Sequence, residues 1–409
     1  MHIIVANNIY PPIMAGGAEL IVSYLCEGLA NRGHRVTVIS TCGPEMEPYP
    51  VEMRNGVEVI RYFPRNRYWT FARAALKGQE LGFRDKINTA RWHLKDAWNR
   101  DAGRHARAIF MSSRPDVLHT HVIDGFSATI WYEAKRIGIP VIHTAHDYHL
   151  ICPRAFLLSR SWQICSNPTL ACRLYRFWHL HTSENVDLFA SPSKFLLGLH
   201  AEAGLQSAES AIVPSGVPLP ASKKPVRSVP FNRFLLLSRL TVEKGIRVVL
   251  EAMARLPKNI DLEVSIGGRG PLESEVLDAA SKDSRIRFLG YVQGEAKEAA
   301  LNYADHLLLP SLWYENSPVV ILEAAAWGLS LIGSRIGAIP EFVREGFTGR
   351  LFAPGNAHDL AETMVAAMTD AGLHIGLETN GAMLISNFTV DRMVDSYLGH
   401  YERLVQRAV

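Results

Sequence analysis

Short apolar runs alternate with polar segments along the chain, and the first segments set the pattern. The run Met1–Asn8 predicts a strand, and the loop Pro11–Glu19, with its glycines and prolines, follows it. The next segment predicts a helix that ends near Asn31, and Arg35–Ser40 predicts a second strand. A strand, a helix and a strand in this order are typical of a unit whose two strands are parallel.

Further strands are expected in two sets. The first set lies at 57–62, 115–120, 139–144 and 186–191, and the second begins at Phe234–Ser238 and continues at 262–267, 286–290, 306–310 and 329–333. Between the sets, Pro214–Pro230 contains five prolines and is predicted to be a linker. The fold class is therefore α/β, with parallel-sheet domains at 1–215 and 231–387. The amphipathic run Met393–Val405 predicts a last helix over about 388–409.

Composition agrees with this organisation. A chain of 409 residues is too long for one ordinary hydrophobic core. Apolar residues make up 48% and charged residues 20%, which is typical of a globular protein and not of a disordered one. We find no apolar run as long as a membrane span and no basic lead of a signal peptide. The five cysteines are an odd set in a long chain, so we expect a reduced, cytoplasmic compartment.

Two glutamates flank a predicted helix start. Seven residues separate Glu315 from Glu323, and between them Ser317 is predicted to cap a helix whose first turn contains Pro318. Glu315 would lie at the positive end of that helix and Glu323 about two turns inside it. Backbone amides at such a start suit a phosphate, and the carboxylates can hold sugar hydroxyls and a ribose. The pattern predicts a pocket for a sugar joined to a nucleoside diphosphate, although acidic residues also occur at helix starts because they complement the dipole.

Other chemically capable residues follow predicted strands. Arg239 and Lys244 come just after the strand that opens the second domain, where parallel sheets bind ligands, and two cations there can neutralise a diphosphate. Gly267–Pro271 and Gly290–Val292 also follow strands, and glycines allow backbone amides to approach a ligand closely. Solvated surface cations and plain glycine turns remain the alternative interpretations.

Histidines end two strands of the first domain. His119 and His121 alternate with Thr120, so both side chains are expected on one face of the sheet. Two histidines can bind a metal, but no further ligands follow at a recognisable spacing. His146 and Asp147 end the next strand, where a histidine can also be purely structural.

These motifs resemble the retaining glycosyltransferases of family 4, and the similarity covers nearly the whole chain. The resemblance implies the GT-B fold, in which two Rossmann-like domains face a cleft and the last helix crosses back onto the first domain. It implies transfer of a sugar, with retention of configuration, from a nucleoside-diphosphate sugar to a glycan or lipid-linked acceptor. Cell-surface polysaccharide or glycolipid assembly would be the setting.

The resemblance also implies roles for particular residues. Arg239 and Lys244 would stabilise the leaving diphosphate, Glu315 would contact the transferred sugar, and His121 would lie near the reacting centre. His146 and Asp147 would line the acceptor cleft. The implied donor-binding set is Gly16, Gly17, Gly268, Gly270, Tyr291, Val292, Asn316, Ser317, Pro318 and Glu323. The family commonly has Glu-Gly-Phe-Gly where this chain has Glu-Asn-Ser-Pro. The resemblance therefore does not indicate which sugar is transferred.

No Asp-x-Asp motif occurs in the sequence, so we expect activity without a divalent metal or other cofactor. No carboxylate presents itself as a nucleophile for double displacement, which favours departure and return on the same face within an ion pair. A sugar-nucleotide epimerase of the same fold remains an alternative. A dinucleotide dehydrogenase is excluded because the first loop lacks Gly-x-Gly-x-x-Gly. A non-catalytic sugar-binding protein is disfavoured because the charged residues of the expected site are all present: Arg239, Lys244, Glu315 and Glu323.

Positive charge is concentrated between Arg61 and Arg107. This segment has twelve basic and four acidic residues, so its net charge is +8, while the whole chain has +3. Aromatic residues are interleaved with the charges, among them Tyr68, Trp69, Phe71, Trp92 and Trp98. The pattern predicts peripheral docking on an anionic membrane, at the inner face of the plasma membrane, with core-facing aromatics as the alternative. We expect no nucleic acid partner because no nucleic-acid-binding motif accompanies the charge. Cys152, Cys165 and Cys172 are too unevenly spaced for a zinc site.

Overall fold

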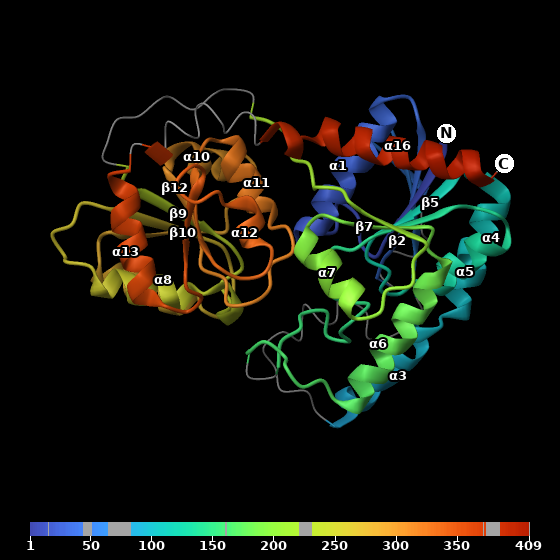
Figure 1. The fold of residues 1–409 in the computed structure, drawn as a ribbon, viewed down its shortest axis with the longest axis horizontal. Coiled ribbons are helices and arrows are strands. Elements are labelled where there is room, and N and C mark those ends of the chain that lie inside the picture. Colours follow the sequence, from blue (N-terminus) through green and yellow to red (C-terminus); the bar gives the residue numbers. More distant parts are fainter. Residues whose placement is uncertain are drawn as a thin grey trace. The chain divides into compact units, whose positions relative to one another are not determined.

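The computed structural model describes residues 1–14, 16–43, 51–63, 83–159, 162–220, 231–370, 372–373 and 385–408. Their contacts divide the chain into two units. Unit 1 contains Met1–Leu157, Ser166–Gly216 and Val390–Val409, and unit 2 contains Leu158–Cys165 and Val217–Thr389. Each unit is built around its own sheet, so the expected α/β class with two parallel-sheet domains is confirmed (Figure 1).

Unit 1 contains an eight-stranded sheet in the order β3-β4-β2-β1-β5-β6-β7-β8. Neighbouring strands are parallel except for β3 and β4. The bounds are β1 His2–Asn7, β2 Arg35–Thr41, β3 Val51–Arg54, β4 Val57–Tyr62, β5 Val117–Thr120, β6 Val141–Thr144, β7 Leu188–Ser191 and β8 Glu209–Ile212. The sequence did not predict β3 and β8. Both lie at an edge of the sheet and bury few side chains, so neither has the apolar run of an inner strand.

Seven helices accompany this sheet in the described residues: α1 Gly17–Asn31, α3 Phe83–Ala97, α4 Arg100–Ser113, α5 Thr129–Arg136, α6 Leu170–Thr182, α7 Lys194–Glu202 and α16 Val390–Ala408. The last helix, α16, packs against α1 (Figure 1). A Cβ on Gly28 of α1 would lie 2.7 Å from a Val394 side-chain carbon of α16, so glycine is needed for this close approach. The short 3₁₀ helix η2 spans Ser183–Asn185.

Unit 2 contains a six-stranded parallel sheet in the order β11-β10-β9-β12-β13-β14. The strands are β9 Arg233–Leu237, β10 Glu263–Gly267, β11 Ile286–Gly290, β12 His306–Leu309, β13 Ser330–Ser334 and β14 Gly349–Phe352. The helices are α8 Ile246–Arg255, α9 Glu273–Lys282, α10 Glu295–Tyr303, α11 Val319–Ala326, α12 Ile339–Phe342 and α13 Ala357–Met368, with 3₁₀ helices η3 Val242–Lys244 and η5 Ser386–Phe388. The sequence predicted all of these strands except the edge strand β14.

Both sheets reverse their strand order at one point. In unit 2, β9 is followed on one side by β10 and on the other by β12, and in unit 1, β1 lies between β2 and β5. In open parallel sheets, ligands bind beyond the carboxyl ends of the strands at such a point. The predicted chemistry lies there in both units, because Arg239 follows β9 and His121 follows β5.

Some residues of the predicted basic and aromatic segment, 61–107, are buried and do not lie at the surface. Arg61 is buried, and its guanidinium donates to the carbonyls of Tyr10 and Pro11. Trp92 is also buried, so for this residue the core alternative is right. Positions 64–82 of the segment lie outside the described residues. Among the helices that are described, none is long and apolar enough to cross a membrane.

Candidate active site

The centre of the unit 2 site is an ion pair between two residues from different strand ends. Lys244 lies in η3 after β9, and Glu315 lies in the loop after β12. Their Nζ and Oε1 atoms are 2.7 Å apart, and the side chains are 15% and 6% exposed. Ser311 donates a second hydrogen bond, of 2.6 Å, to the same oxygen. The strands β9 and β12 are neighbours, so the sheet brings these distant residues together.

The environment keeps Glu315 ionised. Burial alone would raise the pKa of this carboxyl, but the charge of Lys244 and the hydrogen bonds of Lys244, Ser311 and Trp313 together outweigh burial and hold the pKa below its usual value. The backbone of Glu315 is fixed as well, because its carbonyl accepts from Ala338 N at 2.8 Å. A Cβ on Gly337 would lie 2.6 Å from Glu315 N, so only glycine permits this approach.

Helix α11 begins next to this pair, but not as the sequence predicts. The N-cap is Pro318, which makes no side-chain hydrogen bond, so the expected cap by Ser317 is wrong. The Ser317 hydroxyl is buried and has no hydrogen-bond partner among the described residues. Because α11 has no side-chain cap, its first amides depend on other partners, and an anion with the hydroxyl of Ser317 beside it would fit this start.

Glu323 is the fifth residue of α11, so it lies about one turn inside the helix instead of the expected two. Its carboxylate pairs with Lys297 of α10 at 2.5 Å. Sequence reasoning missed Lys297 because nothing in the polar start of α10 distinguishes it from a surface lysine. Arg239 pairs with the buried Glu243 at 3.3 Å and is 38% exposed, which leaves its guanidinium accessible to solvent.

The glycine loop after β10 is shaped by its own chain. A Cβ on Gly268 would lie 1.8 Å from the carbonyl oxygen of Ser238, and one on Gly270 would lie 2.4 Å from that of Leu240. Packing against the segment after β9 therefore already requires both glycines, whether or not a ligand approaches. Arg269, between them, lies 4.6 Å from the ring centre of the exposed Tyr291, and Val292 follows in the same loop.

In unit 1, the structure brings His121 and His146 together. His121 Nδ1 and His146 Nε2 are 2.9 Å apart. Burial lowers the pKa of both rings, to about 4 for His146, so both are neutral at pH 7. Because neutral imidazole has one donor and one acceptor, a single proton joins the pair. His121 Nε2 is buried and has no hydrogen-bond partner in the described residues, so it can serve a substrate hydroxyl.

Both ring nitrogens of His119, unlike those of His121, lie within hydrogen-bond distance of protein hydroxyls. Its Nδ1 lies 2.7 Å from the Tyr401 hydroxyl of α16, and its Nε2 lies 2.7 Å from the Thr144 hydroxyl. Tyr397 also meets Thr144, at 2.8 Å. The rings of His119 and His121 are 4.1 Å apart, which confirms that both lie on one face of the sheet. His119 is thus a structural residue that supports His121.

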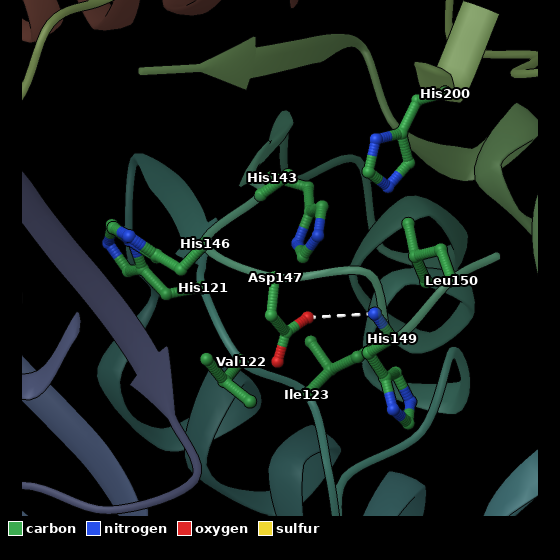
Figure 2. Close-up of a pocket in the computed structure, with 10 residues that line it drawn as sticks. His121, Val122, Ile123, His143, His146, Asp147, His149, Leu150 and His200 are labelled. Atoms are coloured by element: carbon green, nitrogen blue, oxygen red, sulfur yellow. Dashed lines mark hydrogen bonds between the residues drawn. The ribbon is translucent and has the colours of Figure 1, made fainter. Parts of the chain in front are cut away.

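A small cavity lies beside the histidine pair (Figure 2). Its volume is about 10 Å³, enough for about one water molecule, and Asp147, His143 and His200 also line it. Asp147 accepts from the backbone N of His149 at 2.8 Å, as the dashed line in Figure 2 shows. Burial raises the pKa of Asp147 to about 6.

His149, which also lines this cavity, belongs to a buried charged group that the sequence did not reveal. Asp96, Asp124 and His149 bring possible ligand atoms within 4.8 Å of one another. His149 Nδ1 pairs with Asp124 Oδ1 at 2.9 Å, and Asp96 accepts from Gly125 N at 2.9 Å. Burial by itself would lower the pKa of His149, but the charges of Asp124, Asp147 and Asp96 and the hydrogen bond to Asp124 together outweigh burial and raise it to about 9. The protonated histidine therefore balances part of the carboxylate charge.

Gly16 and Gly17 lie where α1 begins. Gly16 is the residue before the helix, and its N–H donates to Glu19 Oε2 at 2.8 Å. A Cβ on Gly16 would meet nothing nearer than this oxygen at 3.8 Å. Packing within the described chain therefore does not require this glycine, which leaves room for a ligand near the helix start.

Two family models match this chain. Residues 16–216 match the glycosyl transferase 4-like domain, and residues 232–370 match glycosyl transferases group 1. An uncharacterized 42.6 kDa protein in the cps region of Klebsiella pneumoniae is 30% identical over 84% of this chain and 88% of its own length. Glycogen synthase of Mycobacterium tuberculosis is 27% identical over 90% of this chain and 86% of its own. Among solved structures, HepE of Anabaena in complex with UDP has a TM-score of 0.70 at 15% identity, covering 98% of this chain and 100% of HepE. HepE has also been solved with UDP-glucose.

Proposed function

Because this chain belongs to the family 4 glycosyltransferases, enzymes of the GT-B fold, we propose that it transfers a sugar from a nucleoside-diphosphate sugar to a glycan or lipid-linked acceptor with retention of configuration. The observation that carries this proposal is the start of α11. A helix without a side-chain cap begins beside the buried Lys244–Glu315 pair, and the Ser317 hydroxyl has no partner in the described residues. An anionic group that is bonded to a sugar matches all three features.

The donor would be held mainly by unit 2. The diphosphate would accept hydrogen bonds from the first amides of α11 and from Arg239 and Lys244. The Glu323 carboxylate would accept hydrogen bonds from the ribose hydroxyls. It would then interact with both the ribose and Lys297, its partner in the structure. The bound UDP and UDP-glucose of HepE support this class of donor for the present chain. Glu315 would accept from sugar hydroxyls, since Lys244 keeps it ionised.

The chemical step would begin with cleavage of the bond between the anomeric carbon and the diphosphate oxygen, which keeps the electron pair. Arg239 and Lys244 would stabilise this developing charge. The acceptor hydroxyl would then attack the anomeric carbon from the same face, and its proton would pass to the departing phosphate oxygen. Because the acceptor attacks from the face that the diphosphate leaves, the configuration of the anomeric carbon is retained. His121 Nε2 would hold a hydroxyl of the reacting sugar, and His146 would fix its tautomer.

We further propose that the reaction needs no divalent metal and that it serves glycan or glycolipid assembly on the cytoplasmic side of the membrane. Cations and a helix start can supply the charge stabilisation that a metal supplies elsewhere. The similarity to glycogen synthase supports a glycan as one acceptor class.

The test is a panel of nucleoside-diphosphate sugars, incubated with the full chain and a chelator, with released nucleoside diphosphate as the measurement. We expect slow hydrolysis of one donor without acceptor. Glu323→Gln should lower kcat/KM roughly 30-fold, which corresponds to about 2 kcal/mol for a hydrogen bond to a charged group. The control is Glu275→Gln, because Glu275 is an exposed acid of α9 that pairs with Arg247 and should not matter.

Three results would count against the proposal. Epimerised donor without release of nucleotide would favour the epimerase alternative. Complete loss of activity with the chelator, restored by magnesium or manganese, would refute metal independence. Equal activity of the Glu323 and Glu275 variants would refute the donor site.

A further inference from the structure

Helix α6 exposes an apolar stripe to solvent. Leu170, Leu174, Phe177 and Trp178 follow the spacing of one helix face and are 72%, 61%, 68% and 40% exposed. The buried residues of α6 are His179, Leu180 and Thr182. The helix is thus attached by a mostly polar side and presents its apolar side outward, which is the reverse of an ordinary surface helix.

The charges around this stripe are positive. Among the 13 residues of α6 there is no acid, and Arg173 and Arg176 are its arginines. The neighbouring α3 packs against α6 (Figure 1). In sequence, α3 has four basic residues against two acids, and one of those acids, Asp96, is buried. In sequence, the two helices together therefore have six basic residues and two acids.

Aromatic side chains lie at one end of the stripe. The Trp178 indole N–H donates to the carbonyl of Ala97 at 2.9 Å. The ring of Trp98 lies 6.1 Å from that of Trp178 and 5.5 Å from that of Tyr132, which is 40% exposed. Tryptophan and tyrosine have apolar rings with one polar atom, so they favour the boundary between lipid headgroups and acyl chains.

We propose that α6 docks the protein on an anionic membrane, with Leu174 and Phe177 at the centre of the contact. A helix with an apolar stripe, flanking arginines and no acids has the features of helices that lie in the plane of a membrane interface. Its apolar side chains enter the headgroup boundary, and Arg173 meets lipid phosphates. A second copy of this chain fits less well, because a two-fold contact through α6 would bring its arginines against each other.

This surface differs from the one that the sequence predicts. It is centred on residues 170–178, whereas the predicted basic segment ends at Arg107. This inference rests on the proposed function only for the reason why docking would be useful, namely that a lipid-linked acceptor is presented at a membrane. Docking itself is a property of α6 and needs neither donor nor acceptor.

The test is co-sedimentation of the full chain with vesicles of phosphatidylcholine alone and of phosphatidylcholine mixed with phosphatidylglycerol, at low and high salt. We expect binding to the anionic vesicles that weakens with salt. Leu174→Ser with Phe177→Ser should lower the partition coefficient roughly tenfold or more, because two apolar side chains are lost. Arg173→Gln should reduce mainly the salt-sensitive part. Met53→Ser is the control, since Met53 is 70% exposed on the edge strand β3 and should not affect binding.

Wild-type binding by the serine double variant would overturn the proposal, as would equal binding to neutral and anionic vesicles. A dimer that the double variant abolishes while vesicle binding persists would instead assign the stripe to a second copy. Thermal unfolding checks that each variant is folded. Donor hydrolysis should be unchanged in all three variants. If wild type binds vesicles but hydrolyses no donor, the proposed function fails and the docking surface stands.

Discussion

Lys244→Met removes the cation that faces the buried carboxylate of Glu315. The two side chains are 2.7 Å apart and only 15% and 6% exposed, so water can replace the lost partner poorly. Breaking a buried pair and leaving one charge uncompensated costs about 3–5 kcal/mol. The bond from Ser311 remains and offsets part of this cost. We therefore expect unit 2 to lose about 3 kcal/mol of stability, in addition to a loss of donor turnover.

Glu315→Gln, alone and combined with Lys244→Met, completes a double-mutant cycle. The amide keeps the shape of the side chain without its charge, so the double variant should be more stable than Lys244→Met alone by at least about 1 kcal/mol. The pH dependence has a definite sign. In wild type the pKa of Glu315 is lowered, so its contribution is present above the unfolded pKa and disappears as pH falls. Without Lys244 burial raises that pKa, so the single variant should lose stability as pH rises from 5 to 8.

The assay is hydrogen–deuterium exchange of peptides that cover 306–326, together with urea unfolding of the full chain at both pH values. Lys135→Met is the control, because Lys135 pairs with Asp187 at the same distance of 2.7 Å but at 40% and 24% exposure. An exposed pair of this kind is worth less than about 1 kcal/mol. If Lys244→Met behaves like Lys135→Met, and the double variant is no more stable than the single one, the buried pair does not stabilise unit 2.

Three further outcomes are expected. Tyr401→Phe removes a 2.7 Å hydrogen bond to His119, so unfolding should cost about 1 kcal/mol less in a thermal melt, and an unchanged melting temperature would contradict the support of His119 by α16. Gly245→Ala should destabilise the protein by about 2 kcal/mol or more in urea, since φ is 71° and a Cβ would lie 1.8 Å from a backbone carbonyl oxygen. The pKa of His149 is raised to about 9, so its contribution, on the order of 3 kcal/mol, is complete below pH 6.5 and is lost as pH rises through 9. Asp124→Asn should flatten this slope of urea midpoint against pH, and a slope that persists would assign it to another group.

The sequence by itself determined the class of fold and the loops that bear the chemistry. Inner parallel strands are buried on both sides, so runs such as Leu307–Leu309 are visible as local patterns. The loops after these strands could also be located, and this placed Arg239, Lys244, Glu315 and His121 at the carboxyl ends of strands. Where a strand is an edge, as in β8, local pattern gave no signal because half of its side chains face solvent.

Only the tertiary structure decided which of these residues meet. Lys244 and Glu315 are 71 residues apart, and they form a pair because β9 lies beside β12 in the sheet. The N-cap of α11 is Pro318, one residue later than the capping propensity of Ser317 predicts. Trp92 is buried although the sequence interleaves it with surface charges, whereas Phe177 of α6 is exposed. Local pattern reports what each segment can bury, but which face becomes buried depends on neighbours that are distant in the chain.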